Sequence, residues 1–378
     1  MTVIAQIAPA IRPGSGVEAV AFHLEQEFER AGVRTERFTM KDARGDWIPE
    51  TGRGWVRQGA HALRVTWFST VGTVLARRRY ARRSDVVTIC HNDVVAGDVY
   101  INHGILQVAM RARGNYVRRM VRNPLHLFTA ARDHIRYRGT VHQTVVNLTE
   151  REDVDLRRTY PGIRPRTLVI GNGVDVDRYR PPSDAERTSA RQSLSLAHED
   201  LALLFVGHEH ERKGLPVVLD ALAELPENVR LIVVGGSVTA VDALRRSSHA
   251  RGLGARVQAV GSCEDPRAYF HAADALVFPS SYESYGLVVL EALASGLPVV
   301  ATSTGCVPDV ILQGVNGYVV DGSAQQIRGR ILDLLREGPS SMAHAARRTA
   351  EAHSWAAVAR EYLAVVDQVV QSRAAQPG

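Results

Sequence analysis

Cysteine, lysine and long apolar runs are all scarce in this sequence. Its 378 residues include three cysteines, Cys90, Cys263 and Cys306, which are too few and too scattered for a disulfide framework or a thiolate metal site. We therefore expect a reducing, cytoplasmic location. No apolar run approaches the roughly 20 residues that a membrane span needs. The N-terminus lacks a basic segment before its short apolar run, so it predicts a first strand rather than a signal peptide.

The basic residues are almost all arginine and are unevenly placed. Only Lys41 and Lys213 are lysines among the 46 basic residues. Residues 51–140 contain 16 arginines and four acidic residues, a net charge of +12, whereas the whole chain carries +6. Such a segment suits nucleic acid, an anionic membrane surface or an anionic acceptor, or it is simply solvated. Of these ligands we expect no nucleic acid.

Membrane contact has one candidate segment. Five arginines between Arg77 and Arg83 follow the apolar stretch Leu63–Leu75, in which Trp67 and Phe68 are the largest side chains. This stretch either enters a bilayer interface or forms a core helix. The first alternative would hold the protein peripherally at the inner face of the membrane. We expect the following basic stretch, 111–138, to be helical, with an apolar side formed by Met110, Val117, Met120, Leu125 and Phe128.

The chain is too long for one average core and alternates short apolar strands with amphipathic helices, which predicts two α/β domains. We place an acceptor-binding domain at 1–178 with 355–378 returning to it as a helix, and a donor-binding domain at 179–354. Residues 41–60, rich in Gly, Arg and Asp, predict an exposed loop. The expected strands of the two domains are 3–8, 33–38, 86–90, 99–102, 141–147 and 167–170, then 201–207, 229–234, 257–260, a short run ending in 276–278, 299–301 and 318–320.

The most informative stretch is Phe278–Thr302, which reads as a strand end, a polar loop, a helix and a second strand. It carries one carboxylate in the loop, Glu283, and another on the helix, Glu291. The first helical turn leaves backbone N–H groups of residues 285–287 without intrahelical partners, and such a helix start favours an anion. A ligand that wants both carboxylates and an anion site has hydroxyls and a phosphate. A sugar nucleotide fits that description.

This stretch resembles the retaining glycosyltransferases of family 4, which share a Glu-x7-Glu motif. The matching segments are Glu283-Ser-Tyr-Gly-Leu-Val-Val-Leu-Glu291, the preceding Phe278-Pro279-Ser280, the following Glu291-Ala-Leu-Ala-Ser-Gly-Leu-Pro298, Asn316-Gly317 and the basic Arg212-Lys213-Gly214. The resemblance implies a GT-B fold, in which two Rossmann-like domains face each other across a cleft and a C-terminal helix crosses back to the first domain. It also implies transfer of a hexose-type sugar from a nucleotide-diphosphate sugar, with retention of anomeric configuration.

The same resemblance assigns roles to residues. Glu291 would accept hydrogen bonds from the ribose, Glu283 from the donor sugar, and Arg212 with Lys213 would neutralise the diphosphate. His103 would contact the sugar near the reacting carbon, with His91 as its competitor for that role. The remaining donor-binding residues expected are Gly14 and Gly16 in the first domain and Gly207, Ser284, Tyr285, Gly286 and Leu287 in the second.

We predict neither a metal nor a cofactor. Asp175 and Asp177 form an Asp-x-Asp pair, but they sit next to a turn and a proline-rich linker, so we interpret Asp177 as a turn or cap residue. A non-catalytic nucleotide-sugar-binding protein and an epimerase of the same fold remain alternatives. The acceptor stays open between a glycolipid, a glycan and a small metabolite.

Overall fold

The computed structural model describes residues 2–14, 16–50, 54–112 and 114–375. The chain divides into two compact units. Unit 1 consists of Met1–Asn172 with Trp355–Gly378, and unit 2 of Gly173–Ser354. The first segment and the last helix of the chain therefore belong to the same unit.

Unit 1 is built on a six-stranded parallel sheet in the order β2-β1-β3-β4-β5-β6. Most of its residues are apolar and fully buried, which is typical of a sheet covered by helices on both faces. The strands are β1 Val3–Ile7, β2 Arg34–Phe38, β3 Val86–His91, β4 Val99–Ile101, β5 Thr144–Asn147 and β6 Arg166–Val169.

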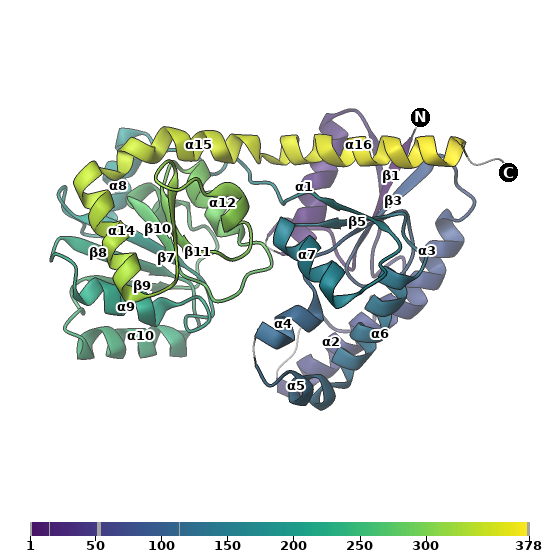
Figure 1. Ribbon diagram of the computed structural model, residues 1–378, viewed down its shortest axis with the longest axis horizontal. Coiled ribbons are helices and arrows are strands. Elements are labelled where there is room, and N and C mark those ends of the chain that lie inside the picture. Colours follow the sequence, from purple (N-terminus) through teal and green to yellow (C-terminus); the bar gives the residue numbers. More distant parts are fainter. Residues whose placement is uncertain (1, 15, 51–53, 113, 376–378) are drawn as a thin grey trace. The chain divides into compact units, whose positions relative to one another are not determined.

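The helices of unit 1 lie between its strands in the sequence, except for the last, α16, which follows unit 2 (Figure 1). They are α1 Val17–Arg30, α2 Gly54–Trp67, the π-helix η1 Phe68–Gly72, α3 Thr73–Tyr80, α4 Leu106–Ala112, α5 Tyr116–Arg122, α6 Pro124–Arg138, α7 Glu150–Thr159 and α16 Trp355–Ala374. Helix α16 packs on α1, where Trp355 stacks on His23 with ring centroids 5.1 Å apart. The prediction that the C-terminal helix returns to the first domain is therefore confirmed.

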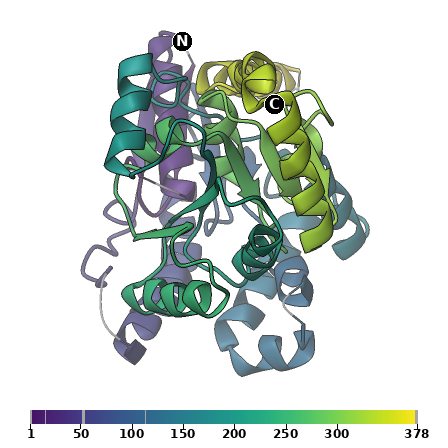
Figure 2. The same ribbon diagram turned by 90° about the vertical axis from the view of Figure 1, so that its left-hand side faces the viewer.

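Unit 2 repeats the same architecture with the strand order β12-β11-β10-β7-β8-β9. Its strands are β7 Leu201–Val206, β8 Val229–Val234, β9 Val257–Gly261, β10 Ala275–Phe278, β11 Val299–Thr302 and β12 Gly317–Val320. Its helices are α8 Asp184–Ser193, α9 Leu215–Ala223, α10 Val238–Ala250, α11 Arg267–Ala272, α12 Leu287–Ala294, α13 Val307–Val310, α14 Ala324–Glu337, the 3₁₀ helix η2 Pro339–Met342 and α15 Ala343–Ala352. Helices lie on both sides of this sheet (Figures 1 and 2).

Each sheet has one point at which the strand order reverses direction. In unit 1 it lies between β1 and β3, and in unit 2 between β7 and β10. Open parallel sheets bind ligands outside the carboxyl ends of the strands at such points. A ligand site is therefore expected in the loops that follow these four strands.

Two expectations about the basic segment need correction, and one alternative is decided. Within the expected loop 41–60, Ala43 and Ile48 are buried and α2 begins at Gly54, because this segment covers the edge of the core; residues 51–53 lie outside the described part. Of the two alternatives for the apolar stretch from Leu63, its large side chains favour the core helix, since Phe68 is fully buried and Trp67 packs against the same core. Val117, in contrast, is 70% exposed.

Candidate active site

Three of the predicted site residues meet at the reversal point of unit 2. Oε1 of Glu283 lies 2.7 Å from Nζ of Lys213 and 3.1 Å from a guanidinium nitrogen of Arg212. The hydroxyl of Ser280 donates to the same oxygen over 2.7 Å. Within the described residues, every polar contact of this carboxylate goes to Oε1, so Oε2 is free to accept hydrogen bonds from a ligand. We call these four residues the clasp.

The clasp forms because two loops are held tightly together. The carbonyl of Arg212 accepts a hydrogen bond from the backbone N–H of Ser281 over 3.0 Å, and its guanidinium donates to the carbonyl of Tyr282. Gly214 has a left-handed φ of 80°, and a Cβ at this position would lie 2.3 Å from the carbonyl oxygen of Pro279. Glycine is therefore required for the loop after β7 to approach the loop after β10.

Lys213 is enclosed rather than solvated. Its side chain is 14% exposed, and its ammonium lies 4.6 Å from the centroid of the Phe278 ring. Its stem covers Gly207, where a Cβ would be 3.0 Å from Cγ of the lysine. Lys213 therefore places a compact ammonium next to Glu283. The planar guanidinium of an arginine would not fit the same space in the same way.

Helix α12 starts beside the clasp, as predicted. Its N-cap, Gly286, has a left-handed φ of 88°, and Tyr285 is buried with its carbonyl accepting from the N–H of Cys306 over 2.7 Å. In the described part of the chain, the backbone N–H groups of Gly286 and Leu287 donate to no protein acceptor. These two donors at a helix start can hold an anion. Ser284 lies in the same loop and is exposed.

Glu291 lies on α12 and contacts the segment that enters unit 2. The hydroxyl of Tyr179 donates a hydrogen bond to its carboxylate, and the charge of Arg178 also favours ionisation. Burial opposes both effects and raises the pKa of Glu291 to about 7. Its carboxylate is thus half ionised near neutral pH. Tyr179 belongs to the predicted exit segment, but its role as a partner of Glu291 was not apparent from the sequence.

In unit 1, the two competing histidines lie next to each other at the reversal point. Nδ1 of His91 and Nε2 of His103 are 3.1 Å apart, and the rings are nearly parallel at 20°. His91 is fully buried, whereas His103 is partly exposed. Gln6 of β1 completes the group, because its Oε1 lies 2.9 Å from Nε2 of His91. A buried glutamine inside an apolar strand was the available signal, and the sequence interpretation missed it.

The glycine loop after β1 has the expected backbone. Gly14 and Gly16 have φ values of 136° and 78°, and Gly16 is the N-cap of α1. A Cβ at either position would meet no atom within 4 Å. The backbone conformation therefore favours glycine at both positions. Because glycine has no side chain, the space beside the loop stays open.

Two further histidines of unit 2 organise the loop after β8. Nδ1 of His208 accepts from the backbone N–H of Gly236 over 3.2 Å, and Nε2 of His210 lies 3.3 Å from the carbonyl of Gly235. A Cβ on Gly236 would lie 2.7 Å from the ring of His210. His208, which follows Gly207 where an additional arginine is frequent in the resembled family, thus ties two loops together.

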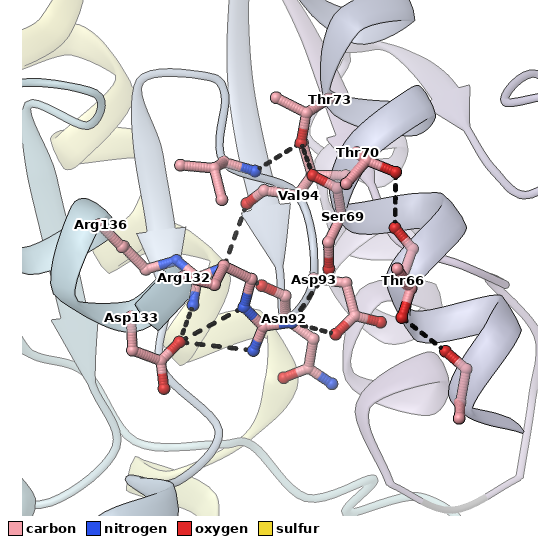
Figure 3. A network of polar contacts seen from close by, with 12 residues as sticks. Thr66, Ser69, Thr70, Thr73, Asn92, Asp93, Val94, Arg132, Asp133 and Arg136 are labelled. Atoms are coloured by element: carbon pink, nitrogen blue, oxygen red, sulfur yellow. Dashed lines mark hydrogen bonds and ion pairs between the residues drawn. The ribbon is translucent and has the colours of Figure 1, made fainter. Parts of the chain in front are cut away.

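The carboxyl end of β3 carries a dense polar network, shown in Figure 3. Asn92 adopts a left-handed φ of 58°, and the buried guanidinium of Arg136 donates to its carbonyl. Arg132 pairs with Asp93 over 2.7 Å and also contacts Asp133. The left-handed Asn92, immediately after His91, is thus held by the buried Arg136, which indicates that its surroundings impose this conformation.

The Asp-x-Asp pair forms a turn. Oδ1 of Asp175 accepts from the backbone N–H groups of Asp177 and Arg178, over 3.2 and 2.9 Å. Asp177 lies within this turn, as predicted, and the side chain of Asp175 caps it. Among the residues that the structure describes, no three His, Cys, Asp or Glu side chains are grouped closely enough to hold a metal ion.

The two six-stranded parallel sheets and their interleaved helices define the GT-B fold. Residues 186–353, nearly all of unit 2, match the model of the family described as glycosyl transferases group 1. Both clasp loops and Glu291 lie within this match.

Solved structures with the same fold cover almost the whole chain. Sucrose-phosphate synthase from Thermosynechococcus elongatus superimposes with a TM-score of 0.75 at 21% identity, covering 98% of this chain and 100% of that one. WaaG, a glycosyltransferase involved in lipopolysaccharide biosynthesis, gives 0.72 at 21% identity, covering 95% and 98%. HepE from Anabaena in complex with UDP gives 0.67 at 19% identity, covering 97% and 100%.

Curated relatives match over shorter stretches. The D-inositol 3-phosphate glycosyltransferase of Xylanimonas cellulosilytica is 37% identical over 243 residues, which are 61% of this chain and 58% of that protein. The enzyme of the same name from Mycobacterium tuberculosis strain H37Ra is 38% identical over 201 residues, 50% of this chain and 41% of that protein. The chain thus spans about half the length of these relatives.

Proposed function

We propose that this protein is a glycosyltransferase that moves a hexose-type sugar from a nucleotide-diphosphate sugar to an acceptor, with retention and without a metal. The clasp is the observation that carries the proposal. It combines a cationic pair with a carboxylate that has one free oxygen, and the two unpartnered amides of Gly286 and Leu287 lie beside it at the reversal point of unit 2. The match of this unit to the glycosyl transferases group 1 family supports the same activity.

Each part of the clasp has a separate task in this reaction. Negative charge grows on the diphosphate as the glycosidic bond breaks, and Lys213 with Arg212 would stabilise it together with the amides of α12. Oε2 of Glu283 would accept from sugar hydroxyls. Because Lys213 and Arg212 also contact Glu283, the carboxylate holds both cations in place before the donor binds.

Glu291 would bind the nucleoside part of the donor. Glu291 lies further along α12 than the helix start, and its carboxylate would accept hydrogen bonds from the ribose. UDP is a reasonable first nucleotide to test, since HepE was solved with UDP and with UDP-glucose. The name of the curated relatives suggests D-inositol 3-phosphate as one acceptor to test, an anionic small metabolite.

The test is a donor and acceptor screen with purified protein. UDP-, GDP- and ADP-linked hexoses are incubated with and without inositol 3-phosphate, and nucleotide release and product formation are measured. Proton NMR of the first product gives the anomeric configuration. We expect transfer from one of these nucleotide sugars. If the anomeric bond of that donor is axial, we expect the new bond in the first product to be axial as well. Donor binding without any turnover would favour the non-catalytic alternative, and interconversion of two free nucleotide sugars would favour an epimerase.

A second, narrower proposal concerns membrane contact, which we place on α5 instead of the arginines that follow Leu75. Three of those arginines are engaged inside the unit: Arg79 pairs with Asp42 over 2.9 Å, Arg83 pairs with Glu36 and Asp85, and Arg77 donates to the carbonyl of Val95. The charge of Arg79 and Arg83 is therefore balanced locally, and the large side chain of Phe68 belongs to the core.

Helix α5 has the opposite properties. Val117 and Val121, one helical turn apart, are 70% and 66% exposed. Next to them Arg118, Arg119 and Arg122 line a cavity with His61, and no acidic side chain lines it among the described residues. Unbalanced arginines beside exposed apolar side chains suit the surface of an anionic membrane. No helix of the described chain is long and apolar enough to cross a bilayer.

A further inference from the structure

Three side chains that lie far apart in the sequence form one hydrogen-bonded row in unit 1. Gln6 is on β1, His91 ends β3, and His103 follows β4, and these three strands are adjacent in the sheet. The row starts at the carbonyl of Ala21 in α1, which accepts from Nε2 of Gln6 over 2.7 Å. Gln6 and His91 are fully buried.

The direction of every hydrogen bond in this row follows from its first member. A backbone carbonyl only accepts, so the amide nitrogen of Gln6 must face Ala21, and its oxygen must face Nε2 of His91. Nε2 of His91 therefore carries a proton and donates. In a neutral imidazole the other nitrogen is then an acceptor, so Nδ1 of His91 accepts from Nε2 of His103.

Neutral rings are the forms that this environment favours. Burial lowers the pKa of His91 well below its usual value, and it lowers the pKa of His103 to about 3. A charged His91 would donate from both nitrogens and would reverse the last bond of the row. Because the ring is buried without a carboxylate in contact, the neutral form prevails at neutral pH.

We infer that Gln6 and His91 are positioning residues that hold His103 in its Nε2–H form, so that its Nδ1 accepts a hydrogen bond from a hydroxyl of the bound substrate. In the described chain, Nδ1 of His103 has no protein partner. The substrate part of this inference rests on the proposed function and on the contact with the donor sugar that the family resemblance implies for His103. A neutral acceptor nitrogen binds a sugar hydroxyl and repels a carboxylate, so the row would favour a hexose over a hexuronate.

The tautomers are measurable without any substrate. Long-range ¹H–¹⁵N spectra of protein labelled at histidine distinguish protonated from unprotonated ring nitrogens, and the signals are assigned by the variants His91→Gln and His103→Gln. We expect His91 and His103 both to be protonated at Nε2 at pH 7.5. His142 is an internal reference of the opposite kind, since its Nδ1 lies 3.0 Å from the carbonyl of Gly97 and must donate to it. A proton on Nδ1 of His103 would overturn the inference.

Variants of Gln6 test whether the row sets the tautomer. Gln6→Met removes the acceptor for His91, so His103 should populate both tautomers. Gln107→Met is the matched control, because it removes a glutamine that bonds to Tyr160 outside the row, and it should keep the native tautomer of His103. An unchanged His103 spectrum in Gln6→Met, or the same disturbance in both variants, would contradict the relay. Circular dichroism and the unfolding midpoint verify that each variant is folded.

The effect of the row on sugar transfer is measured separately, by steady-state kinetics. With UDP-glucose as the probe, Gln6→Met should lower kcat/KM at least about tenfold, as expected for one lost hydrogen bond near the reacting sugar, and Gln107→Met should leave it near normal. In the native protein, UDP-glucuronate should be used at least about tenfold less well than UDP-glucose. Equal use of both would refute the hydroxyl preference. No turnover of any nucleotide sugar would instead refute the proposed function and leave the tautomer result intact.

Discussion

The ammonium of Lys213 lies 2.7 Å from Oε1 of Glu283, on loops that leave neighbouring strands of unit 2. The cation proposed for the diphosphate and the carboxylate proposed for the sugar are thus in contact before any ligand binds. Such a pair is pre-organised, because the donor does not have to order two flexible side chains when it enters. The first prediction follows from this contact.

Lys213→Ala and Glu283→Gln should each lower kcat by about 10²–10³ while the fold is retained, since each removes charge or hydrogen bonding at the reacting end of the donor. The double variant should lose less than the two single losses combined, because the two residues act as a unit. Arg245→Ala, which removes an exposed pair with Asp242 on α10, is the control and should be near normal. Steady-state kinetics measure all four, and near-normal turnover in either clasp variant would contradict the assignment.

Glu291 should make donor binding dependent on pH. Its pKa of about 7 means that the carboxylate form, which accepts from the ribose, becomes dominant only above neutral pH. We expect UDP affinity to rise about tenfold from pH 6 to pH 8, as the ionised fraction does. Isothermal titration calorimetry should find this rise absent in Glu291→Gln. An unchanged pH profile in that variant would assign the titration to another group.

Ionisation of Glu291, which should strengthen UDP binding, should lower the stability of the folded protein. A carboxyl whose pKa is raised on folding binds more protons in the folded state, so the free energy of unfolding falls as pH rises from about 4.5 to 7. Glu291→Gln should therefore gain stability relative to the native protein at pH 8, on the order of 3 kcal/mol at most, and gain nothing at pH 4. Urea unfolding at both pH values measures the difference.

Gly214→Ala should test the close approach of the two clasp loops. The substitution adds left-handed strain and a clash with the carbonyl of Pro279 at 2.3 Å, so we expect a loss of about 2–3 kcal/mol in unfolding free energy together with weaker UDP binding. Gly252→Ala is the matched control, because it has a similar φ of 72° with no atom near its Cβ. Equal losses in both variants would mean that the loop contact contributes nothing beyond backbone strain.

Metal independence stays a prediction. The cationic clasp and the amides of α12 would supply the charge that a divalent ion supplies in other enzymes, so excess EDTA should leave activity unchanged. Activity is measured after dialysis against EDTA and again after addition of Mg²⁺ or Mn²⁺. Restoration only by added metal would contradict this prediction.

Vesicle binding distinguishes the two basic surfaces of unit 1. Replacing Arg118, Arg119 and Arg122 with glutamine should weaken sedimentation with anionic vesicles about 100-fold, at about 1 kcal/mol for each arginine near the surface. Replacing Arg77, Arg79 and Arg83 with glutamine is the charge-matched control and should have a small effect, because these three arginines are engaged within the unit. Binding to neutral vesicles, or loss only in the control, would refute attachment through α5.

Local sequence alone determined the order of strands and helices. Apolar β-branched runs, helix caps and glycines act within a few residues, so β8 was predicted at its exact bounds and the start of α12 was identified from Gly286. The donor motif was recognisable for the same reason, since Glu283 and Glu291 lie within one strand-loop-helix unit. The burial of Phe68 and the exposure of Val117 were not predictable, because both lie in amphipathic stretches that either face could bury.

Only the tertiary structure decided which distant residues meet. Placing β10 beside β7 brings Glu283 to Lys213 across 70 residues of sequence, and placing β1 beside β3 brings Gln6 to His91 across 85. Strand order is set by the packing of whole helices against the sheet, a property that no local pattern encodes. The charge balance around Glu283, the raised pKa of Glu291 and the tautomer of His103 all depend on those neighbours.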